Sequence, residues 1–213
     1  MSVETLVRPQ PKRRRKLRPE RLTFEQFLDL VHEDQKADLI RGVIYMQSPL
    51  STLHELLFLF LAHLIDLFVR RKKLGVVLGS RSAAHLSEHD GPEPDLMFIS
   101  KQRQHLVKPA YVDGAPDLIV EITSPSTAHI DRVKKKKQYL EFGVQEYWMI
   151  NPNQQTAEFL FNHEGEWEPL PVTPEGIFHS RVIPGFWLQI DWLFAEELPD
   201  PLEAVMQILN IEA

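Results

Sequence analysis

Cysteine is missing from this sequence of 213 residues. Its absence excludes a disulfide framework, a thiolate zinc site and a cysteine nucleophile, and it is compatible with a reducing cytosol. No apolar stretch follows the basic N-terminus, so a secretory signal is not predicted. The most apolar window, Leu53 to Val69, is interrupted by Glu55 and Asp66, which favours a buried amphipathic helix over a membrane span. We therefore expect a cytoplasmic protein that does not cross a membrane.

Charge is unevenly distributed along the chain. The formal net charge is -6, but residues 1–21 carry eight Lys and Arg against two acids, whereas residues 151–213 carry one base against eleven acids. A polyanion would approach the first segment and avoid the last. We expect residues 1–21 to form a flexible basic arm, either a solubilising tail, which the pattern favours, or an arm that tracks DNA. The overall acidity argues against tight, non-specific DNA binding.

The rest of the chain has the composition of an ordinary globular domain, with 43% hydrophobic and 25% charged residues. We expect one domain over residues 22–200 and a C-terminal helix or tail over 201–213. Periodicity predicts helices after the N-cap Thr23 and at 51–73, 126–142 and 202–209. It predicts strands at 38–46 (with a bend or tight turn at Gly42), 75–79, 82–86, 95–99, 117–122, 145–150, 156–161, 166–170 and 186–190. This order predicts an α/β (α+β) fold in which helices flank a mixed β-sheet and a β-hairpin region is added.

Acidic residues accompany two of the predicted strands. Asp117 and Glu121 share one face of a strand but stand about 13 Å apart, too far for one metal ion to join them. Asp95 belongs to another predicted strand. If the two strands pair, Asp95 and Glu121 can come within reach of one cation. Glu121 lies in an apolar run, where a carboxylate is costly unless it is paired or metal-bound. A position on a half-exposed strand is the alternative for Glu121.

The helix that follows carries a polar stripe. Asp131, Lys135 and Tyr139 recur every four residues and therefore share one helix face. An ordinary exposed helix could show the same pair of Asp131 and Lys135, so the spacing alone does not decide a role.

Several blocks of sequence occur together in an order that is specific. They are GAPDLIVEITSPST at 114–127, GVQEYWMINP at 143–152, DLIRG at 38–42, SPLSTLHE at 48–55, EPDLMFIS at 93–100 and VIPGFWLQI at 182–190. With the polar stripe, these blocks resemble the Uma-two family of PD-(D/E)xK restriction-endonuclease-like proteins. The resemblance covers roughly residues 23–195, and it implies a restriction-endonuclease-like fold.

The resemblance also implies an activity, a metal-dependent endonuclease that hydrolyses DNA phosphodiester bonds. Asp95 and Glu121 would be the metal ligands, since Mg²⁺ or Mn²⁺ prefers carboxylate oxygens. Asp38 and His54 match further acidic and histidine positions of the family. A strict E-x-K motif would place its lysine at position 123, which is Thr123 here. The resemblance therefore implies that the catalytic lysine lies on the helix, where Lys135 is the best placed and Lys134 and Lys137 are the alternatives.

Two further readings stay open at this point. The chain could be a catalytically weak or inactive module that kept the nuclease fold for nucleic-acid binding or protein interaction, as its acidic surface would suit. A hydrolase of another phosphate ester is also compatible with these residues, since a fold does not determine a substrate. The resemblance further implies a homodimer. We expect the apolar segment 202–211 to be exposed, so it would suit the interface of that dimer.

Overall fold

The structure is a computed structural model that describes residues 21–31, 35–47, 51–79, 81–123 and 130–210 (only the backbone for 130–132). Apart from Arg21, the predicted basic arm lies outside the described residues.

A mixed sheet of six strands forms the centre of the molecule, in the order β10-β9-β8-β7-β5-β3. The strands are β3 (Gly75–Gly79), β5 (Leu96–Ser100), β7 (Leu118–Ile122), β8 (Glu146–Asn151), β9 (Thr156–His163) and β10 (Glu166–Pro169). β7 and β8 run parallel, and the other neighbouring strands of this sheet are antiparallel. The predicted fold class and the hairpin of β9 and β10 are confirmed.

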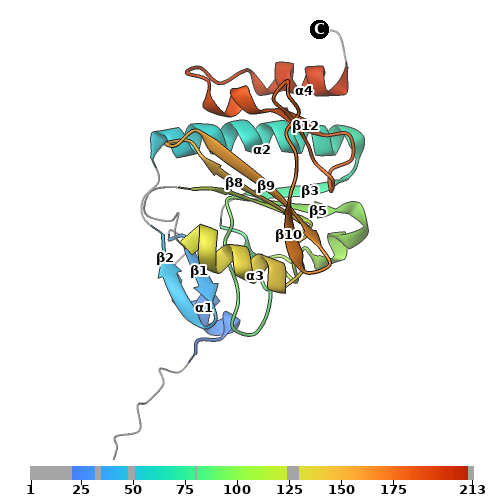
Figure 1. The fold of residues 1–213 in the computed structure, drawn as a ribbon. Helices are drawn as coiled ribbons and strands as arrows, with labels where there is room; N and C mark the ends of the chain where they lie inside the picture. Colours follow the sequence, from blue (N-terminus) through green and yellow to red (C-terminus); the bar gives the residue numbers. More distant parts are fainter. Residues whose placement is uncertain (1–20, 32–34, 48–50, 80, 124–129, 211–213) are drawn as a thin grey trace, which may run out of the picture.

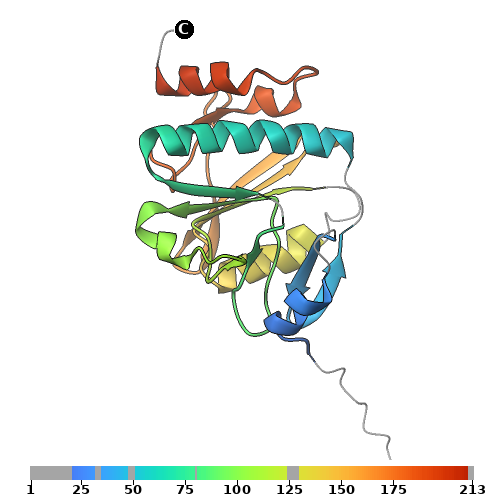
Figure 2. The same ribbon diagram turned by 180° about the vertical axis from the view of Figure 1, so that it is seen from behind.

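Helices cover both faces of this sheet. The long helix α2 (Thr52–Lys72) lies on one face and α3 (Lys136–Glu141) on the other, as Figures 1 and 2 show from opposite sides. Side chains alternate along β7 between the two faces. Val120 and Ile122 join the apolar cluster of α2, whereas Ile119 joins the cluster that contains Tyr139 of α3. Glu121, two residues from Ile119, therefore points to the α3 face.

Helix α2 begins and ends as its sequence predicts. Ser51 is its N-cap and accepts a hydrogen bond from His54 N, and Lys73 ends it in the left-handed conformation. By length and composition α2 is apolar enough to cross a membrane. Its buried side chains nevertheless pack against the sheet as those of a core helix do.

A hairpin and a small helix lie at one end of the molecule. The segment predicted as one bent strand is two strands, β1 (Ala37–Ile40) and β2 (Val43–Met46), which pair antiparallel. Arg41 and Gly42 both have positive φ angles, so the chain reverses here in a tight turn, one of the two outcomes predicted at Gly42. Helix α1 (Phe24–Leu30) starts at Thr23 with a complete capping box, as predicted.

Several short elements differ from their predictions. The strand predicted at 82–86 is only β4 (Ala83–Ala84), and it pairs with the unpredicted β6 (Tyr111–Val112). The predicted strand at 186–190 is β12 (Trp187–Gln189), whose partner β11 (Ile177–His179) was not predicted. Pairs this short depend on contacts between distant segments rather than on local periodicity. Two 3₁₀ helices, η1 (Lys101–Leu106) and η3 (Ile190–Phe194), were not predicted either.

The C-terminal helix α4 (Pro201–Leu209) packs on α2 and adds an outer layer (Figure 1). Ala204, Val205 and Ile208 are buried in the same cluster as the inner face of α2. The helix itself was predicted, but the expectation that its apolar residues are exposed is wrong for these three. They are covered by the domain's own core.

Candidate active site

Strands β5 and β7 bring the two predicted metal ligands to the same end of the sheet. In their antiparallel register Leu96 pairs with Val120, so Asp95 and Glu121 follow as the next opposite positions. The backbone N–H of Ile122 donates to Asp95 Oδ2 at 2.7 Å, which ties the aspartate to the end of β7. The condition under which Asp95 and Glu121 could share a cation, pairing of their strands, is therefore met.

Lys135 lies between two of the predicted acidic residues. Its Nζ is 3.0 Å from Glu121 Oε1 and 2.9 Å from Asp38 Oδ2. Its exposed fraction is 1%, so the ammonium is buried rather than solvated. Tyr139 donates its hydroxyl to the same Glu121 oxygen at 2.6 Å. Burial and then the charges of Glu121 and Asp38 raise the pKa of Tyr139, so its phenol stays protonated and keeps donating.

A local irregularity of the helix accompanies this arrangement. Residues Ile130–Lys135 form a π-helical segment, and α3 begins at Lys136. A π-turn widens the helix by one residue per turn and is frequent at functional sites. Lys135 and Tyr139 both reach Glu121, as their shared face predicts. The helix was predicted over 126–142, of which 126–129 lie outside the described residues, as does the side chain of Asp131.

Asp38 is held by the hairpin and by the segment before β5. Its Oδ1 accepts from the backbone N–H of Glu93 at 2.9 Å, and its Oδ2 accepts from Gln47 Nε2 at 3.0 Å. Lys135 also contacts Oδ2, so the buried carboxylate of Asp38 and that of Glu121 share one ammonium group. Asp38 therefore lies where it fixes the position of the Lys135 ammonium.

Asp95 carries an ammonium that the sequence did not indicate. Lys36 Nζ lies 2.5 Å from Asp95 Oδ1; Asp95 is buried, and 9% of the Lys36 side chain is exposed. Burial disfavours the charge on Asp95, but Lys36 and the hydrogen bond with His54 outweigh it and lower the pKa of Asp95. Burial also opposes the charge on Lys36, whose pKa is nevertheless raised by Asp95 and then by Glu121. One ammonium therefore interacts with both predicted metal ligands.

His54 joins this cluster from the first turn of α2. Its Nε2 is 3.3 Å from Asp95 Oδ2. Within the part of the chain that the structure describes, its buried Nδ1 makes no hydrogen bond, and Glu55 Oε1 lies 3.8 Å away. His54 thus contacts Asp95, as a residue that positions this carboxylate would.

Glu93 is another acidic group that was not predicted. Its Oε2 accepts from the backbone N–H of Ala37 at 3.2 Å. Burial raises the pKa of Glu93 to about 7, against the lowering effect of that hydrogen bond. Near neutral pH the site therefore includes a carboxyl group that is partly protonated.

Asp117 is excluded from the cluster by its contacts. It accepts from Ser100 N at 2.7 Å and from Arg103 Nη1 at 2.9 Å, at the far end of β7. The separation of Asp117 from Glu121 that the strand geometry predicted is therefore observed.

The donor set suits a hard divalent cation in its chemistry. Asp95 and Glu121 supply carboxylate oxygens, the ligands that Mg²⁺ prefers, and the cationic Lys36 already interacts with both. Among the described residues, no group of three or more His, Asp and Glu side chains is arranged to hold a metal ion. The carboxylates are instead paired with Lys36 and Lys135. Asp95 and Glu121 are the groups that would hold a metal ion.

Sequence reasoning missed Lys36 and Glu93 for different reasons. Lys36 precedes the apolar strand β1 and looks like an ordinary solvated residue before a strand. Glu93 stands in the block EPDLMFIS, two residues before Asp95, which was a usable signal for an additional acidic group. In both cases only the packing of the hairpin on the end of the sheet brings the side chain inward.

Comparison with known proteins identifies the family of this chain. Residues 24–191 match the model of the Uma2 family, which is described as "Putative restriction endonuclease". The chain belongs to the Uma2 family. The resemblance stated from the sequence is thereby confirmed, and membership places this Uma2 protein among restriction-endonuclease-like nucleases.

A solved structure has the same fold as this Uma2 protein. It is a protein from Anabaena variabilis described as a "putative nuclease belonging to DUF820", with a TM-score of 0.68 and 21% sequence identity. The match covers 81% of this chain and 97% of the other. At this identity the likeness shows the fold alone. None of the curated proteins matches this chain.

Proposed function

We propose that this Uma2 protein is a Mg²⁺- or Mn²⁺-dependent endonuclease that hydrolyses DNA phosphodiester bonds. The observation that carries the proposal is the buried Lys135 ammonium bound to Glu121, at the sheet end where Asp95 stands opposite Glu121. Two carboxylates on paired strands and one adjacent ammonium are what metal-assisted phosphodiester hydrolysis needs. Asp95 and Glu121 would hold the cation in this proposal.

Each residue has a part that follows from its contacts. A bound divalent cation supplies Lewis acidity toward a phosphate oxygen and toward a water. Lys135 offers a proton donor and positive charge for the oxygens of the phosphate. Asp38 and Tyr139 hold the Lys135–Glu121 pair in place, and His54 orients Asp95. Lys36 neutralises Asp95.

A second function is favoured by a specific observation. Asp95 and Glu121 each already carry an ammonium partner, which would also suit a nuclease fold kept for nucleic-acid binding or protein interaction. This module would bind no divalent cation at the cluster. The two functions therefore differ in metal binding before any cleavage is measured.

The deciding experiment measures Mn²⁺ binding and plasmid cleavage on the same preparations. We expect the wild type to bind Mn²⁺ in isothermal titration calorimetry and to nick plasmid DNA only with Mg²⁺ or Mn²⁺. Glu121→Gln should lower both the affinity for Mn²⁺ and the rate of plasmid nicking by at least about 100-fold, since it removes a proposed metal ligand. Asp117→Asn is a matched change directly before the same strand and outside the cluster, so this variant should keep both Mn²⁺ binding and nicking.

Two results would contradict the nuclease. Nicking that survives Glu121→Gln unchanged would come from a contaminant. No calorimetric signal at millimolar Mn²⁺, with a folded protein, would favour the interaction module.

The homodimer and the cytoplasmic location also stay proposals. With Ala204, Val205 and Ile208 buried against α2, the apolar surface left for a second copy includes the exposed Leu53 and Leu56 at the start of α2. Light scattering coupled to gel filtration would report a mass of twice 24.8 kDa for a dimer.

A further inference from the structure

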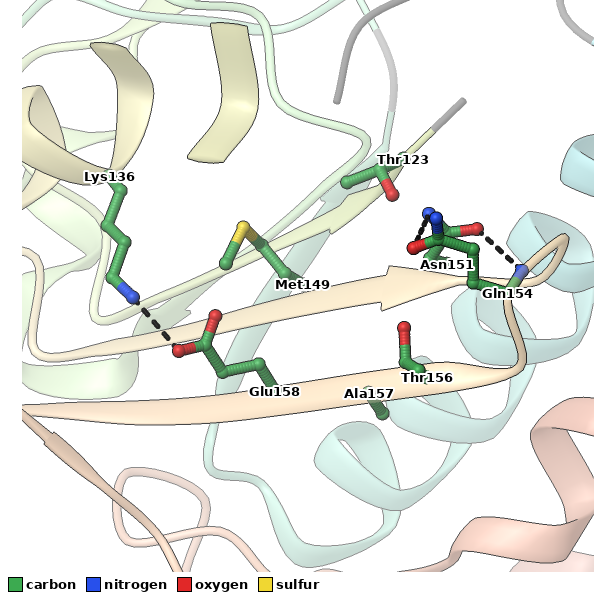
Figure 3. A pocket seen from close by; sticks show the side chains of 8 residues that line it. All are labelled: Thr123, Lys136, Met149, Asn151, Gln154, Thr156, Ala157 and Glu158. Atoms are coloured by element: carbon green, nitrogen blue, oxygen red, sulfur yellow. Dashed lines mark hydrogen bonds and ion pairs between the residues drawn. The ribbon is translucent and has the colours of Figure 1, made fainter. Parts of the chain in front are cut away.

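A hollow of about 390 Å³ opens on the α3 face of the sheet beside Glu121. We call it the β8 hollow, because strand β8 forms its floor between β7 and β9. Its lining residues are Thr123, Lys136, Met149, Asn151, Gln154, Thr156, Ala157 and Glu158 (Figure 3).

The strand register connects this hollow to the candidate active site. Glu121 of β7 pairs with Met149 of β8, and Met149 pairs with Glu158 of β9. Opposite residues of neighbouring strands point to the same face, so these three side chains form one row. At about 4.8 Å per strand, the hollow reaches roughly 10 Å from Glu121. A nucleotide whose phosphate lies at Glu121 could therefore extend its sugar and base over β8.

The next row of the same face is polar. Asn151 pairs with Thr156, and the backbone N–H of Thr123 donates to Ile150 O, which places Thr123 beside Asn151. Figure 3 shows Thr123, Asn151 and Thr156 gathered at one end of the hollow, with Lys136 and Glu158 at the other. The row thus begins at the position where a strict E-x-K motif would have its lysine.

Thr123 carries the observation that points to a ligand. Its exposed fraction is 2%, and its Oγ1 makes no hydrogen bond within the described residues. A buried hydroxyl without a partner costs stability, because the group has lost its water. Since Thr123 lines the hollow, a polar ligand atom in the hollow is the partner that would satisfy it.

The chemistry of the lining suits a nucleobase better than a phosphate. Asn151 Nδ2 donates to the side-chain oxygen of Gln154 at 3.2 Å, and Asn151 Oδ1 accepts from the backbone N–H of Gln154 at 3.0 Å. Thr156 adds a hydroxyl. Lys136, the cation among these lining residues, is paired with Glu158 at 2.9 Å. Uncharged donors and acceptors match the edge of a base, and the thioether of Met149 offers an apolar surface for its ring.

We propose that the β8 hollow binds a nucleobase next to the phosphate that is cleaved, with Thr123 Oγ1 hydrogen-bonded to the base edge. This inference rests on the proposed nuclease function for the place of the phosphate. A base inside a duplex is stacked and paired, so it must leave the stack to enter such a hollow. The substrate class that follows is DNA with unpaired nucleotides, such as single strands, loops or frayed ends.

A binding experiment without cleavage tests this proposal first. The probes are the four deoxynucleoside 5′-monophosphates and deoxyribose 5-phosphate, which carries the same phosphate without a base. We expect at least one nucleotide to shift the side-chain amide signals of Asn151 and Gln154 in NMR spectra and to bind about tenfold more tightly than deoxyribose 5-phosphate. Thr123→Val, which keeps the shape and removes the hydroxyl, should weaken nucleotide binding about fivefold.

Two further variants make the test specific. The double variant Thr123→Val/Thr156→Val should lose more nucleotide affinity than either change alone. Its melting temperature should not fall below that of the wild type, which would show that the fold is kept. Thr173→Val, in the loop before β11 and outside the hollow, should bind nucleotides as the wild type does. Equal affinity for deoxyribose 5-phosphate and the nucleotides, or shifts at Lys135 without shifts in the hollow, would overturn the proposal.

Cleavage assays then separate this proposal from the nuclease itself. On a single-stranded oligonucleotide, Thr123→Val should lower kcat/KM about fivefold. An oligonucleotide with one abasic site beside the cleaved bond should be cut at the same rate by the wild type and by Thr123→Val. If Thr123→Val cleaves every substrate at the wild-type rate, the base subsite is overturned and the proposed nuclease function is not affected. Nucleotide binding that depends on Thr123, with no cleavage in any metal, would overturn the nuclease and leave the subsite intact.

Discussion

The residues of the candidate site form two acid–base groups that meet at the end of β7. In one, Lys135 joins Glu121 to Asp38, and in the other Lys36 pairs with Asp95. Each of these three buried carboxylates thus contacts an ammonium group, with Lys135 shared by Glu121 and Asp38, and a buried charge is costly without such a partner. The same pairing makes Lys36 a competitor of any cation that binds to Asp95.

Replacing Lys36 with Met should strengthen metal binding while it weakens the metal-free protein. Without the ammonium, the buried charge of Asp95 is uncompensated, at a cost of about 3–5 kcal/mol in the free energy of unfolding. A divalent cation can restore that charge balance. We expect the rise in melting temperature on adding Mn²⁺ to be larger for Lys36→Met than for the wild type.

Lys137→Met is the control for this prediction, because Lys137 is an exposed lysine whose partner is Glu141. Its response to Mn²⁺ should equal that of the wild type. A response of Lys36→Met no larger than that of Lys137→Met would show that Lys36 does not compete for the site.

Glu93 should make the stability of the protein fall as the pH rises toward neutrality. Its folded pKa of about 7 lies above the ordinary value of 4.5, so the folded state binds the proton more tightly than the unfolded state. Stability is therefore lost as the pH rises from about 4.5 to about 7, by on the order of 3 kcal/mol. Glu93→Gln keeps an acceptor for Ala37 and removes the titration.

Urea unfolding at pH 5 and at pH 8 checks the effect of Glu93. The wild type should lose stability relative to Glu93→Gln between the two pH values, with the largest gap at pH 8. A gap that is the same at both pH values would mean that Glu93 does not titrate in this interval.

At the scale of elements, one buried carboxylate connects the sheet to the loop after β11. Glu146 begins β8 and accepts from Trp148 Nε1 at 2.7 Å, from Arg181 N at 2.8 Å and from Val182 N at 3.1 Å. Burial raises the pKa of Glu146, against the lowering effect of these hydrogen bonds. The carboxylate holds a backbone segment that has no strand partner of its own there.

Glu146→Ala should lower the free energy of unfolding by about 3 kcal/mol, because it leaves several buried donors without an acceptor. Urea titration followed by tryptophan fluorescence would measure this loss. Glu168→Ala, an exposed glutamate on β10, should change stability by less than about 0.5 kcal/mol. Mn²⁺ binding should be kept in both variants, since neither residue belongs to the candidate site. Equal free energies of unfolding for Glu146→Ala and Glu168→Ala would show that Glu146 does not hold the segment after β11.

Across the whole molecule, the layers are α4, α2, the sheet and α3, and the site lies where the β1–β2 hairpin meets the end of the sheet (Figures 1 and 2). The two apolar clusters on either face of the sheet make the central strands rigid. A rigid sheet end suits a site whose carboxylates must keep their positions.

Ile208→Ala should show that α4 belongs to the folded core. Ile208 is buried against α2, so its truncation should cost about 3 kcal/mol in the free energy of unfolding. Leu202→Ala on the same helix is the control, because Leu202 is 58% exposed and should cost less than about 0.5 kcal/mol. Thermal and urea unfolding of the two variants would measure both values, and equal losses would contradict the packing of α4.

The sequence by itself determined the main elements and pointed to Asp95, Glu121 and Lys135, which the structure places at one end of the sheet. The strands that contain Glu121 and follow Asp95, the helix α2 and the stripe of Lys135 and Tyr139 are each encoded by local periodicity, which depends only on neighbouring residues. A carboxylate inside an apolar run also indicates a paired or metal-bound group, because burying it without a partner is costly. The family followed from ordered blocks of sequence.

Only the tertiary structure decided which charges meet. Lys36 reaches Asp95 because the β1–β2 hairpin packs on the end of the sheet, and no feature of its own segment indicates that contact. The pairing of β4 with β6 and the π-turn before α3 depend in the same way on distant segments. Periodicity records which face of an element is buried, whereas the partner that each buried charge finds depends on how the elements pack.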